Sequence, residues 1–172
     1  MEFRKSYTLS LKDYTTYNLF SHRKQLVLVP IVFFVLMAAA WVFIMLASGP
    51  DVTTLIIVIL LISAFSGLIA LSNALSLNRQ AKRQYQSSHA MKTEFELVID
   101  NDGIRESSSC GSSNAAWEHV LRAVESGSAF YVHVSQLQAF VIPKRLLNAQ
   151  EDALIRSLLT SHLGSKKCRI KR

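Results

Sequence analysis

The apolar positions of this chain are concentrated in two long runs, residues 26–47 and 54–77, of 22 and 24 residues. Asp51 is the only charged residue in the whole region. Helices of these lengths would be about 33 and 36 Å long, which exceeds the roughly 30 Å hydrocarbon core of a bilayer. Each helix would be apolar on every face, and the remaining chain is too short to cover both. The pattern therefore predicts a transmembrane helical hairpin over residues 26–77.

The two runs are joined by residues 48–53, a predicted tight turn. Gly49-Pro50 is expected to end the first helix, and Asp51 is expected to cap the second. Small side chains recur every three or four positions along the second run, and they allow helix backbones to approach closely. We therefore expect this stripe to pack against the first helix near residues 38–40. The stripe consists of Ser63, Gly67, Ala70 and Ala74.

Residues 1–25 precede the hairpin and show two different patterns. Residues 3–11 alternate between apolar and polar side chains, which is typical of a half-buried strand. Asp13 is a suitable N-cap for a short amphipathic helix. The aromatic face of this helix would consist of Tyr14, Tyr17 and Phe20. Because tyrosine is favoured at the headgroup level, the helix is expected to lie at the membrane interface and to lead into the first span.

Residues 78–92 are polar and rich in good helix formers, so the second helix is expected to continue beyond the membrane. From Thr93 the pattern changes to short alternating segments separated by turn residues, which is typical of strands. Residues 107–114 are rich in serine and are expected to form a loop. The expected strands are residues 95–99 and 104–108, one segment that ends near Trp117, one that ends at Glu125, and residues 130–134 and 139–142.

A helix with clear boundaries follows the predicted strands. Asn148 and Glu151 have the spacing of a capping box, and an apolar stripe runs from Leu154 to Leu163 before Gly164. A sheet of about five short strands closed by one amphipathic helix would make residues 93–164 an α+β unit. Because about 72 residues is small for an independent core, we expect the strand at residues 3–11 to join this sheet.

Positive charge lies on one side of the predicted hairpin. Residues 1–25 and 78–92 together hold nine Lys and Arg side chains, whereas residues 48–53 hold none. The positive-inside rule therefore predicts that both termini lie in the cytoplasm. The first span is expected to remain uncleaved, because its 22 apolar residues exceed the about 7–15 of a signal-peptide core.

The net charge of +7 is unevenly distributed along the chain. Residues 93–164 carry −4, and residues 165–172, a basic tail expected to be disordered, carry +5. An acidic body argues against nucleic acid as a partner. The basic side chains beside the spans and in the tail are instead candidates for contact with anionic lipid headgroups. These candidates are Arg23, Lys24, Arg79, Lys82, Arg83, Lys166 and Lys167.

The residue types that carry most enzyme chemistry are scattered. The two Cys and five His residues lack metal-ligand spacing, and no glycine-rich phosphate loop is present, so neither a metal nor a cofactor is expected. Cys110 and His119 would form a nucleophile and its base only if folding brings them together. The other cysteine, Cys168, lies in the basic tail.

Lys144 and Arg145 are the most prominent charged pair next to a predicted strand. One interpretation is that they contact an anion or a protein partner at the end of the last strand. The other is that they are solvated charges that pair with Glu151 or Asp152, since exposed ion pairs contribute little.

Several motifs of the chain resemble those of the YcxB-like family of bacterial membrane proteins. They follow two apolar helices and are Asp102-Gly103-Ile104, Trp117, Phe130-Tyr131 and Ile142-Pro143-Lys144-Arg145. The resemblance covers essentially the whole chain and is most specific over residues 93–160. It implies an inner-membrane location and a cytoplasmic domain similar to bacterial pleckstrin-homology-like (PH-like) folds. It implies no reaction and supplies no catalytic residue.

The expected fold class is an α+β membrane protein with a transmembrane hairpin and a small antiparallel sheet closed by a C-terminal helix. Our leading hypothesis is a non-enzymatic inner-membrane protein that presents a PH-like module to a protein partner or serves in regulation. Two alternatives stay open, a membrane-associated enzyme that uses Cys110 and His119 and a subunit of a small transporter. A transporter would have to be an oligomer, because two helices cannot enclose a path. The sequence identifies neither the partner nor the oligomeric state.

Overall fold

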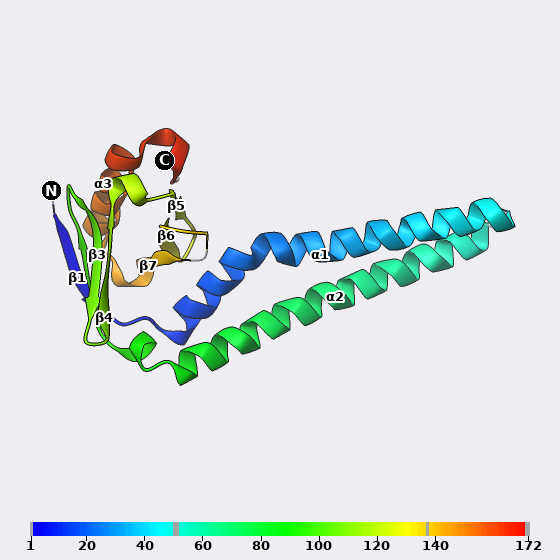
Figure 1. The fold of residues 1–172 in the computed structure, drawn as a ribbon, viewed down its shortest axis with the longest axis horizontal. Coiled ribbons are helices and arrows are strands. Elements are labelled where there is room, and N and C mark those ends of the chain that lie inside the picture. The colour runs from blue at the N-terminus through cyan, green and yellow to red at the C-terminus, as the bar shows by residue number, and fades with distance from the viewer. Residues whose placement is uncertain (1, 50–51, 137, 171–172) are drawn as a thin grey trace. The chain divides into compact units, whose positions relative to one another are not determined.

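The computed structural model describes residues 2–49, 52–136 and 138–170. The chain forms two compact units, which Figure 1 shows as ribbons. Residues 18–82 form the helical unit. Residues 1–17 and 83–172, from both ends of the chain, form the sheet unit.

Two long helices, α1 (Leu11–Ser48) and α2 (Val52–Ser87), build the helical unit and extend into the sheet unit. Both are long and apolar enough to cross a membrane. Their large apolar side chains are exposed along most of their length, with Phe43 76% and Leu46 82% exposed. The helices contain the predicted spans, whereas Pro50 and Asp51, the predicted helix breaker and cap, lie outside the described residues.

The start of α1 differs from the sequence prediction. The helix is continuous from Leu11, and Ser10 rather than Asp13 precedes it. The Ser10 hydroxyl oxygen accepts from the Asp13 backbone N–H (3.2 Å), and the Asp13 carboxylate accepts from the Ser10 backbone N–H (2.9 Å). This is the reciprocal geometry of a capping box, in which Asp13 occupies the third helical position. The prediction that Asp13 caps this helix is therefore wrong, whereas the prediction that the helix leads into the first apolar run is confirmed.

The predicted packing of the small-residue stripe of α2 is wrong for two of its four members. Ser63 and Gly67 are exposed, and a Cβ placed on Gly67 would have no neighbouring atom within 4 Å. Ala70 and Ala74 are half-buried. Ile62 is buried, as is the hydroxyl of Ser66 one turn further along the helix.

Within the described residues, the sheet unit contains two four-stranded sheets rather than one sheet of about five strands. The first sheet, in spatial order, is β1 (Phe3–Tyr7), β2 (Phe95–Ile99), β3 (Gly103–Ser108) and β4 (Gly111–Ala116). The second is β7 (Ala139–Pro143), β6 (Ala129–His133), β5 (Arg122–Glu125) and β8 (Cys168–Arg169). Neighbouring strands are antiparallel except β5 and β8, which are parallel.

The N-terminal strand joins the sheet, as the sequence predicted. β1 pairs with β2 in a register that places Phe3 opposite Ile99 and Tyr7 opposite Phe95. It is shorter than the predicted residues 3–11, because the chain leaves the sheet after Tyr7 and enters α1 at Leu11. A segment that precedes the two helices in the sequence and a segment that follows them therefore belong to the same sheet.

Part of the predicted serine-rich loop is in fact a strand. β4 pairs with β3, with Ser107 opposite Ser112 and Ser108 opposite Gly111. β4 lies at the edge of its sheet, and nearly all of its side chains are exposed. β4 is the strand predicted to end near Trp117, and its end at Ala116 confirms that prediction. Because neither face of the strand is buried, no apolar alternation marks its start at Gly111.

Three short 3₁₀ turns connect the larger elements, η1 (Ala90–Lys92), η2 (Trp117–His119) and η3 (Lys144–Leu146). α2 continues to Ser87, which confirms the predicted helical extension beyond the second span. The turn η2 leads to β5, which confirms the strand predicted to end at Glu125.

The C-terminal helix α3 (Ala149–Lys167) begins with the predicted capping box, in which Asn148 and Glu151 bond reciprocally. The backbone turns at Gly164, whose φ of 64° favours glycine. The chain then continues through Lys167 into β8, where Cys168 lies opposite Ala123 of β5. The prediction of a disordered tail is wrong for residues 165–170, because the turn at Gly164 returns the chain to the edge of β5.

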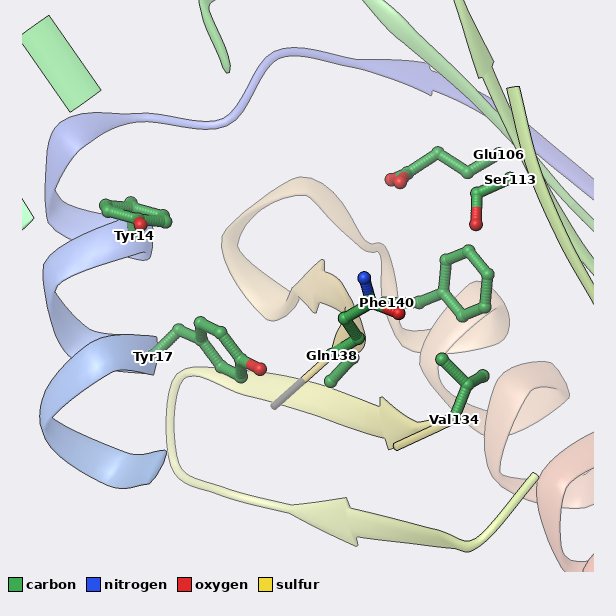
Figure 2. Close-up of a pocket in the computed structure, with 8 residues that line it drawn as sticks. Tyr14, Tyr17, Glu106, Ser113, Val134, Gln138 and Phe140 are labelled. Atoms are coloured by element: carbon green, nitrogen blue, oxygen red, sulfur yellow. The ribbon is translucent and has the colours of Figure 1, made fainter. Parts of the chain in front are cut away.

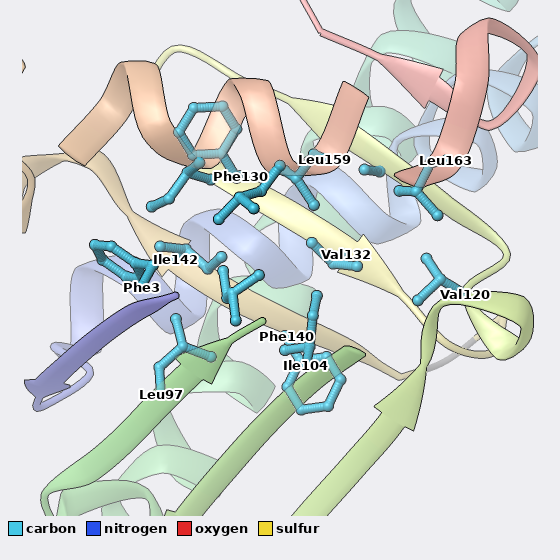
Figure 3. Packing of buried hydrophobic residues seen from close by; sticks show 14 of the residues in the cluster. Phe3, Leu97, Ile104, Val120, Phe130, Val132, Phe140, Ile142, Leu159 and Leu163 are labelled. Carbon is cyan, nitrogen blue, oxygen red and sulfur yellow. The ribbon is translucent and has the colours of Figure 1, made fainter. Parts of the chain in front are cut away.

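The two sheets and α3 enclose one hydrophobic core, which Figure 3 shows from close by. Both sheets and α3 each contribute apolar side chains that are almost completely buried. The labelled members are Phe3, Leu97, Ile104, Val120, Phe130, Val132, Phe140, Ile142, Leu159 and Leu163. Burial of this shared core stabilises the sheet unit as a single folding element.

The core makes a direct prediction for two leucines of the sheet unit. Leu97 is 1% exposed and Leu121 is 51% exposed. We expect Leu97→Ala to lower the free energy of unfolding by about 2–5 kcal/mol, because it leaves a cavity, and Leu121→Ala to change it by about 0.5 kcal/mol. Urea unfolding of the full chain in detergent, followed by Trp117 fluorescence in a Trp41→Phe background, measures both. Equal losses for the two variants would contradict this core.

Candidate functional site

The basic residues beside the apolar runs gather at one end of the helical unit. There a cavity of about 360 Å³ is lined by both helices, which places residues 25–29 of α1 beside residues 73–77 of α2. Arg23 also lies over the ring of Phe20, with 4.2 Å between its guanidinium carbon and the ring centroid. Four exposed candidates for lipid headgroups adjoin this end of the hairpin, namely Arg23, Lys24, Arg79 and Lys82. Arg83, the fifth, is the next residue of α2 and is exposed in the sheet unit.

The two basic candidates in the tail differ in their contacts. Lys167 donates a hydrogen bond to the backbone carbonyl of Val120 (2.9 Å). Lys166 is exposed to solvent. Lys167 therefore connects the end of α3 to the segment that precedes β5. Contact of Lys166 with lipid headgroups stays a prediction.

Lys144 and Arg145 both form ion pairs inside the sheet unit. Lys144 pairs with Glu125 of β5, and Arg145 pairs with Asp13 at the start of α1 (2.6 Å). Arg145 also donates to the Thr8 carbonyl (3.2 Å). Burial raises the pKa of the Asp13 carboxyl, but hydrogen bonds from Arg145 and Ser10 outweigh it and hold the pKa below its usual value. Contact of the two cations with an outside anion or partner stays a prediction.

The predicted partners of these two cations, Glu151 and Asp152, have other partners. Glu151 closes the capping box of α3 and pairs with Lys5 of β1 (2.6 Å). Asp152 pairs with Arg156 one turn along α3 (2.7 Å). The expected pairing is therefore wrong, because it was inferred from proximity in the sequence, whereas the tertiary fold brings Lys5 to Glu151.

The hairpin of β3 and β4 separates Cys110 from His119. Cys110 lies in the turn before β4, and His119 lies in η2, beyond the other end of that six-residue strand. The length of β4, about 20 Å at roughly 3.3 Å per residue, lies between them. The structure therefore does not bring this nucleophile and base together. Burial raises the pKa of the other thiol, Cys168, which favours its unreactive protonated form.

Metal-ligating side chains remain scattered after folding. Across the described ranges 2–49, 52–136 and 138–170, no group of three or more His, Cys, Asp or Glu side chains is arranged to hold a metal ion.

A pocket of about 350 Å³ opens between the start of α1 and the two sheets. Figure 2 shows Glu106 and Ser113 on one side and Tyr14 and Tyr17 projecting from the first turns of α1 on the other. Gln138 and Phe140 complete most of the wall. The pocket therefore combines one carboxylate, aromatic rings and two neutral polar groups.

Glu106 has an unusual hydrogen-bonding position in this pocket. One of its carboxylate oxygens lies 2.5 Å from the Tyr7 hydroxyl, which also lies 3.0 Å from the Val141 carbonyl oxygen. A phenol has one proton, so Tyr7 cannot donate fully to both acceptors. When Glu106 is protonated, it donates to Tyr7, and Tyr7 donates to Val141.

The pKa values of Glu106 and Tyr7 are both raised, which is the direction that favours their protonated forms. Burial raises the pKa of Glu106, although the hydrogen bond from Tyr7 opposes the shift. Burial, together with the nearby Glu106 charge, also raises the pKa of Tyr7, so the phenol keeps its proton. The folded state therefore pays a free-energy cost for an ionised Glu106.

No pattern in the sequence predicts this pocket, although one residue gives a signal of it. Glu106 follows Ile104 by two residues, so both side chains point to the same face of β3. An acidic residue on the inward face of a strand is uncommon, because acidic side chains are rarely buried without a partner. Such a residue therefore indicates a candidate functional or ion-paired group. The sequence pattern predicts that Tyr14 and Tyr17 lie at the membrane interface, and the structure places both in the lining of this pocket.

Glu106→Gln is expected to stabilise the sheet unit near neutral pH, because the neutral amide can donate to Tyr7. Because the folded-state pKa of Glu106 is raised, the contribution of this group to stability is fully present below the ordinary Glu pKa of about 4.3 and is lost as pH rises through the raised value. The unfolding temperature of Glu106→Gln should therefore exceed that of the wild type by a margin that grows with pH. Thermal unfolding of the full chain in nanodiscs, followed by Trp117 fluorescence in the Trp41→Phe background, measures this margin. Glu94→Gln, at an exposed glutamate, should show no such trend; equal wild-type and Glu106→Gln values at all pH would refute the assignment.

Comparison with known proteins matches one segment of the sheet unit to a family. Residues 99–159 match the family model of YcxB-like proteins. No curated protein and no solved structure matches the chain. The matched segment runs from the end of β2 into α3 and includes Glu106, Lys144 and Arg145. The resemblance predicted from the sequence is thereby confirmed over residues 99–159, where this chain is similar to a YcxB-like domain.

Proposed function

We propose that this chain is a two-pass protein of the bacterial inner membrane with both termini in the cytoplasm. Its sheet unit would act there as a PH-like module that binds a protein partner or serves in regulation, without catalysing a reaction. The observation that carries this proposal is the unburied apolar surface of α1 and α2.

A soluble role for the two helices is physically unfavourable. A core helix of a soluble protein is mostly buried, whereas the most apolar windows of these helices are 0% and 6% buried. Each large apolar side chain left in water forgoes about 1.5–3 kcal/mol. A lipid bilayer removes this surface from water without any further protein, and helices satisfy their own backbone hydrogen bonds there.

Two independent observations support an orientation with both termini on the same side. The pairing of β1 with β2 requires the chain to return, after the hairpin, to the side from which it entered. The basic residues Arg23, Lys24, Arg79 and Lys82 adjoin the same end of the hairpin, and positive charge favours the cytoplasmic side.

The sheet unit has features of an interaction module. Two small sheets around one core, closed by a C-terminal helix, fit the PH-like fold that the family resemblance implies. Residues 93–164 carry a net charge of −4, which disfavours anionic lipid headgroups and favours a protein partner. The separation of Cys110 from His119 removes the main support for a membrane-associated enzyme.

Topology reporters test the membrane part of the proposal. Alkaline phosphatase, which is active only outside the cytoplasm, should be active when inserted after Gly49 and inactive when fused after Arg172. A fluorescent protein that matures only in the cytoplasm should give the opposite result. Cytoplasmic signal from the Gly49 insertion would contradict the orientation.

A charge variant tests why the hairpin takes this orientation. Replacing Arg23, Lys24, Arg79 and Lys82 by Gln is expected to give a mixed orientation, because the bias of positive charge is reduced. Replacing the distant Arg105 and Arg122 by Gln is the control and should leave the orientation unchanged. The same reporter activities measure both variants.

Photo-crosslinking in intact cells tests the partner part of the proposal. A photoreactive amino acid is placed at Glu94 and Glu118, two exposed positions of the sheet unit. We expect discrete protein adducts of the full-length chain at one or both positions. Adducts with lipid only would contradict a protein partner and favour headgroup binding by the module.

A further inference from the structure

Glu106 differs from the other partly buried carboxylates of the sheet unit. Glu125 pairs with Lys144 and Arg156, Asp13 pairs with Arg145, and Glu151 pairs with Lys5. By contrast, no Lys, Arg or His of the described chain lies within 4.0 Å of the Glu106 carboxylate. A carboxylate removed from water usually has a cation beside it, and the described residues do not provide one for Glu106.

Two aromatic side chains form the wall opposite Glu106, as Figure 2 shows. They are Tyr14 and Tyr17, which project from α1. Phe140 projects from β7 and lies on the same side of the pocket as Glu106 and Ser113. The faces of such rings attract cations, by about 0.5–2 kcal/mol per ring depending on desolvation. Aromatic rings beside a carboxylate are the surroundings in which proteins bind ammonium groups.

Neighbouring side chains hold both tyrosines in place. The Tyr14 hydroxyl donates to Gln84 (2.9 Å), and its ring centroid lies 6.3 Å from that of Tyr85. The ring of Tyr17 lies against Tyr131, with centroids 5.4 Å apart. A site whose rings are already ordered loses little conformational entropy when a ligand binds.

The size and lining of the pocket narrow the class of ligand. None of the described residues that line the pocket is basic, so these residues would not attract an anion. A volume of about 350 Å³ is at the lower end of the range for small-molecule sites. Ser113 and Gln138 provide neutral hydrogen-bonding groups at the wall. These features select a small molecule that carries one positive charge on a compact, partly apolar group.

We propose that this pocket binds a small organic cation, with the ammonium group beside Glu106 and its alkyl groups against Tyr14, Tyr17 and Phe140. The ligand supplies the positive charge that the protein leaves out, and it holds Glu106 in its ionised form. Because Tyr14 and Tyr17 belong to α1 and Glu106 belongs to β3, the bound cation connects the first turns of α1 with the first sheet.

Calorimetric titration of the full chain in nanodiscs of phosphatidylglycerol tests the proposal. The probe is tetramethylammonium, and tert-butanol is the neutral probe of similar shape. We expect saturable binding of tetramethylammonium at neutral pH and binding of tert-butanol at least tenfold weaker. Equal binding of the two probes, or no saturable binding of tetramethylammonium, would overturn the proposal.

Variants separate the role of the charge from that of folding. Glu106→Gln should weaken tetramethylammonium binding at least tenfold while the sheet unit remains folded by Trp117 fluorescence, and Tyr17→Leu should weaken it several-fold. Glu94→Gln removes the same charge from an exposed position and should bind like the wild type. Wild-type affinity in Glu106→Gln would overturn the proposal, whatever the outcome of the topology experiment.

The ammonium group could come from a free amine or from an amine-bearing lipid headgroup. Nanodiscs that contain phosphatidylethanolamine distinguish the two sources. If the headgroup occupies the pocket, the apparent affinity for tetramethylammonium falls as the fraction of this lipid rises. If the natural ligand is a free amine, the affinity is independent of the lipid, and free ethylammonium competes with the probe.

Discussion

The removal of the apolar surface of α1 and α2 from water is the constraint on which the rest of this structure depends. The most apolar windows of the two helices are almost completely unburied. A bilayer would cover this surface, and the chain would then have to enter and leave it on the same side, because β1 pairs with β2. The hairpin is therefore inserted between two strands of one sheet, and the sheet unit cannot form before both helices have been made.

Because of this connectivity, the walls of the pocket come from segments that are far apart in the sequence. Its aromatic wall belongs to the first turns of α1, and its carboxylate belongs to a strand that follows α2. The Arg145–Asp13 ion pair and the hydrogen bond from Arg145 to Thr8 hold the start of α1 against the sheet unit. A ligand that contacts both Tyr14 and Tyr17 of α1 and Glu106 of β3 would act on this same contact between the start of α1 and the first sheet. Binding and release of the ligand would then change how firmly α1 is held to the sheet.

Glu106 shows that stability and binding make opposite demands on this site. Within the sheet unit alone, an uncharged group at this position would satisfy Tyr7 and Val141 better than an ionised carboxylate. A charged group in such surroundings is typical of functional sites, where a local cost in stability is offset by the interaction with a ligand. Glu125 differs from Glu106 because two cations, Lys144 and Arg156, pair with it inside the sheet unit. Glu125 therefore belongs to an internal ion-pair network, whereas we propose that Glu106 binds a cation from outside the protein.

The sequence by itself determined the features that depend on local patterns: the two apolar helices, the strands with one buried face, the capping box of α3 and the family resemblance of residues 99–159. It predicted a strand that ends near Trp117 but not the start of this strand, β4, at Gly111, because an edge strand exposed on both faces has no alternation. It also did not identify the return of residues 168–169 to β5. It also could not assign the partners of Lys144 and Arg145. Only the tertiary structure brought Glu106 to Tyr7, Tyr14 and Tyr17, because contacts between residues about 90–100 positions apart depend on how β1, α1 and β3 pack, and no local pattern encodes that packing.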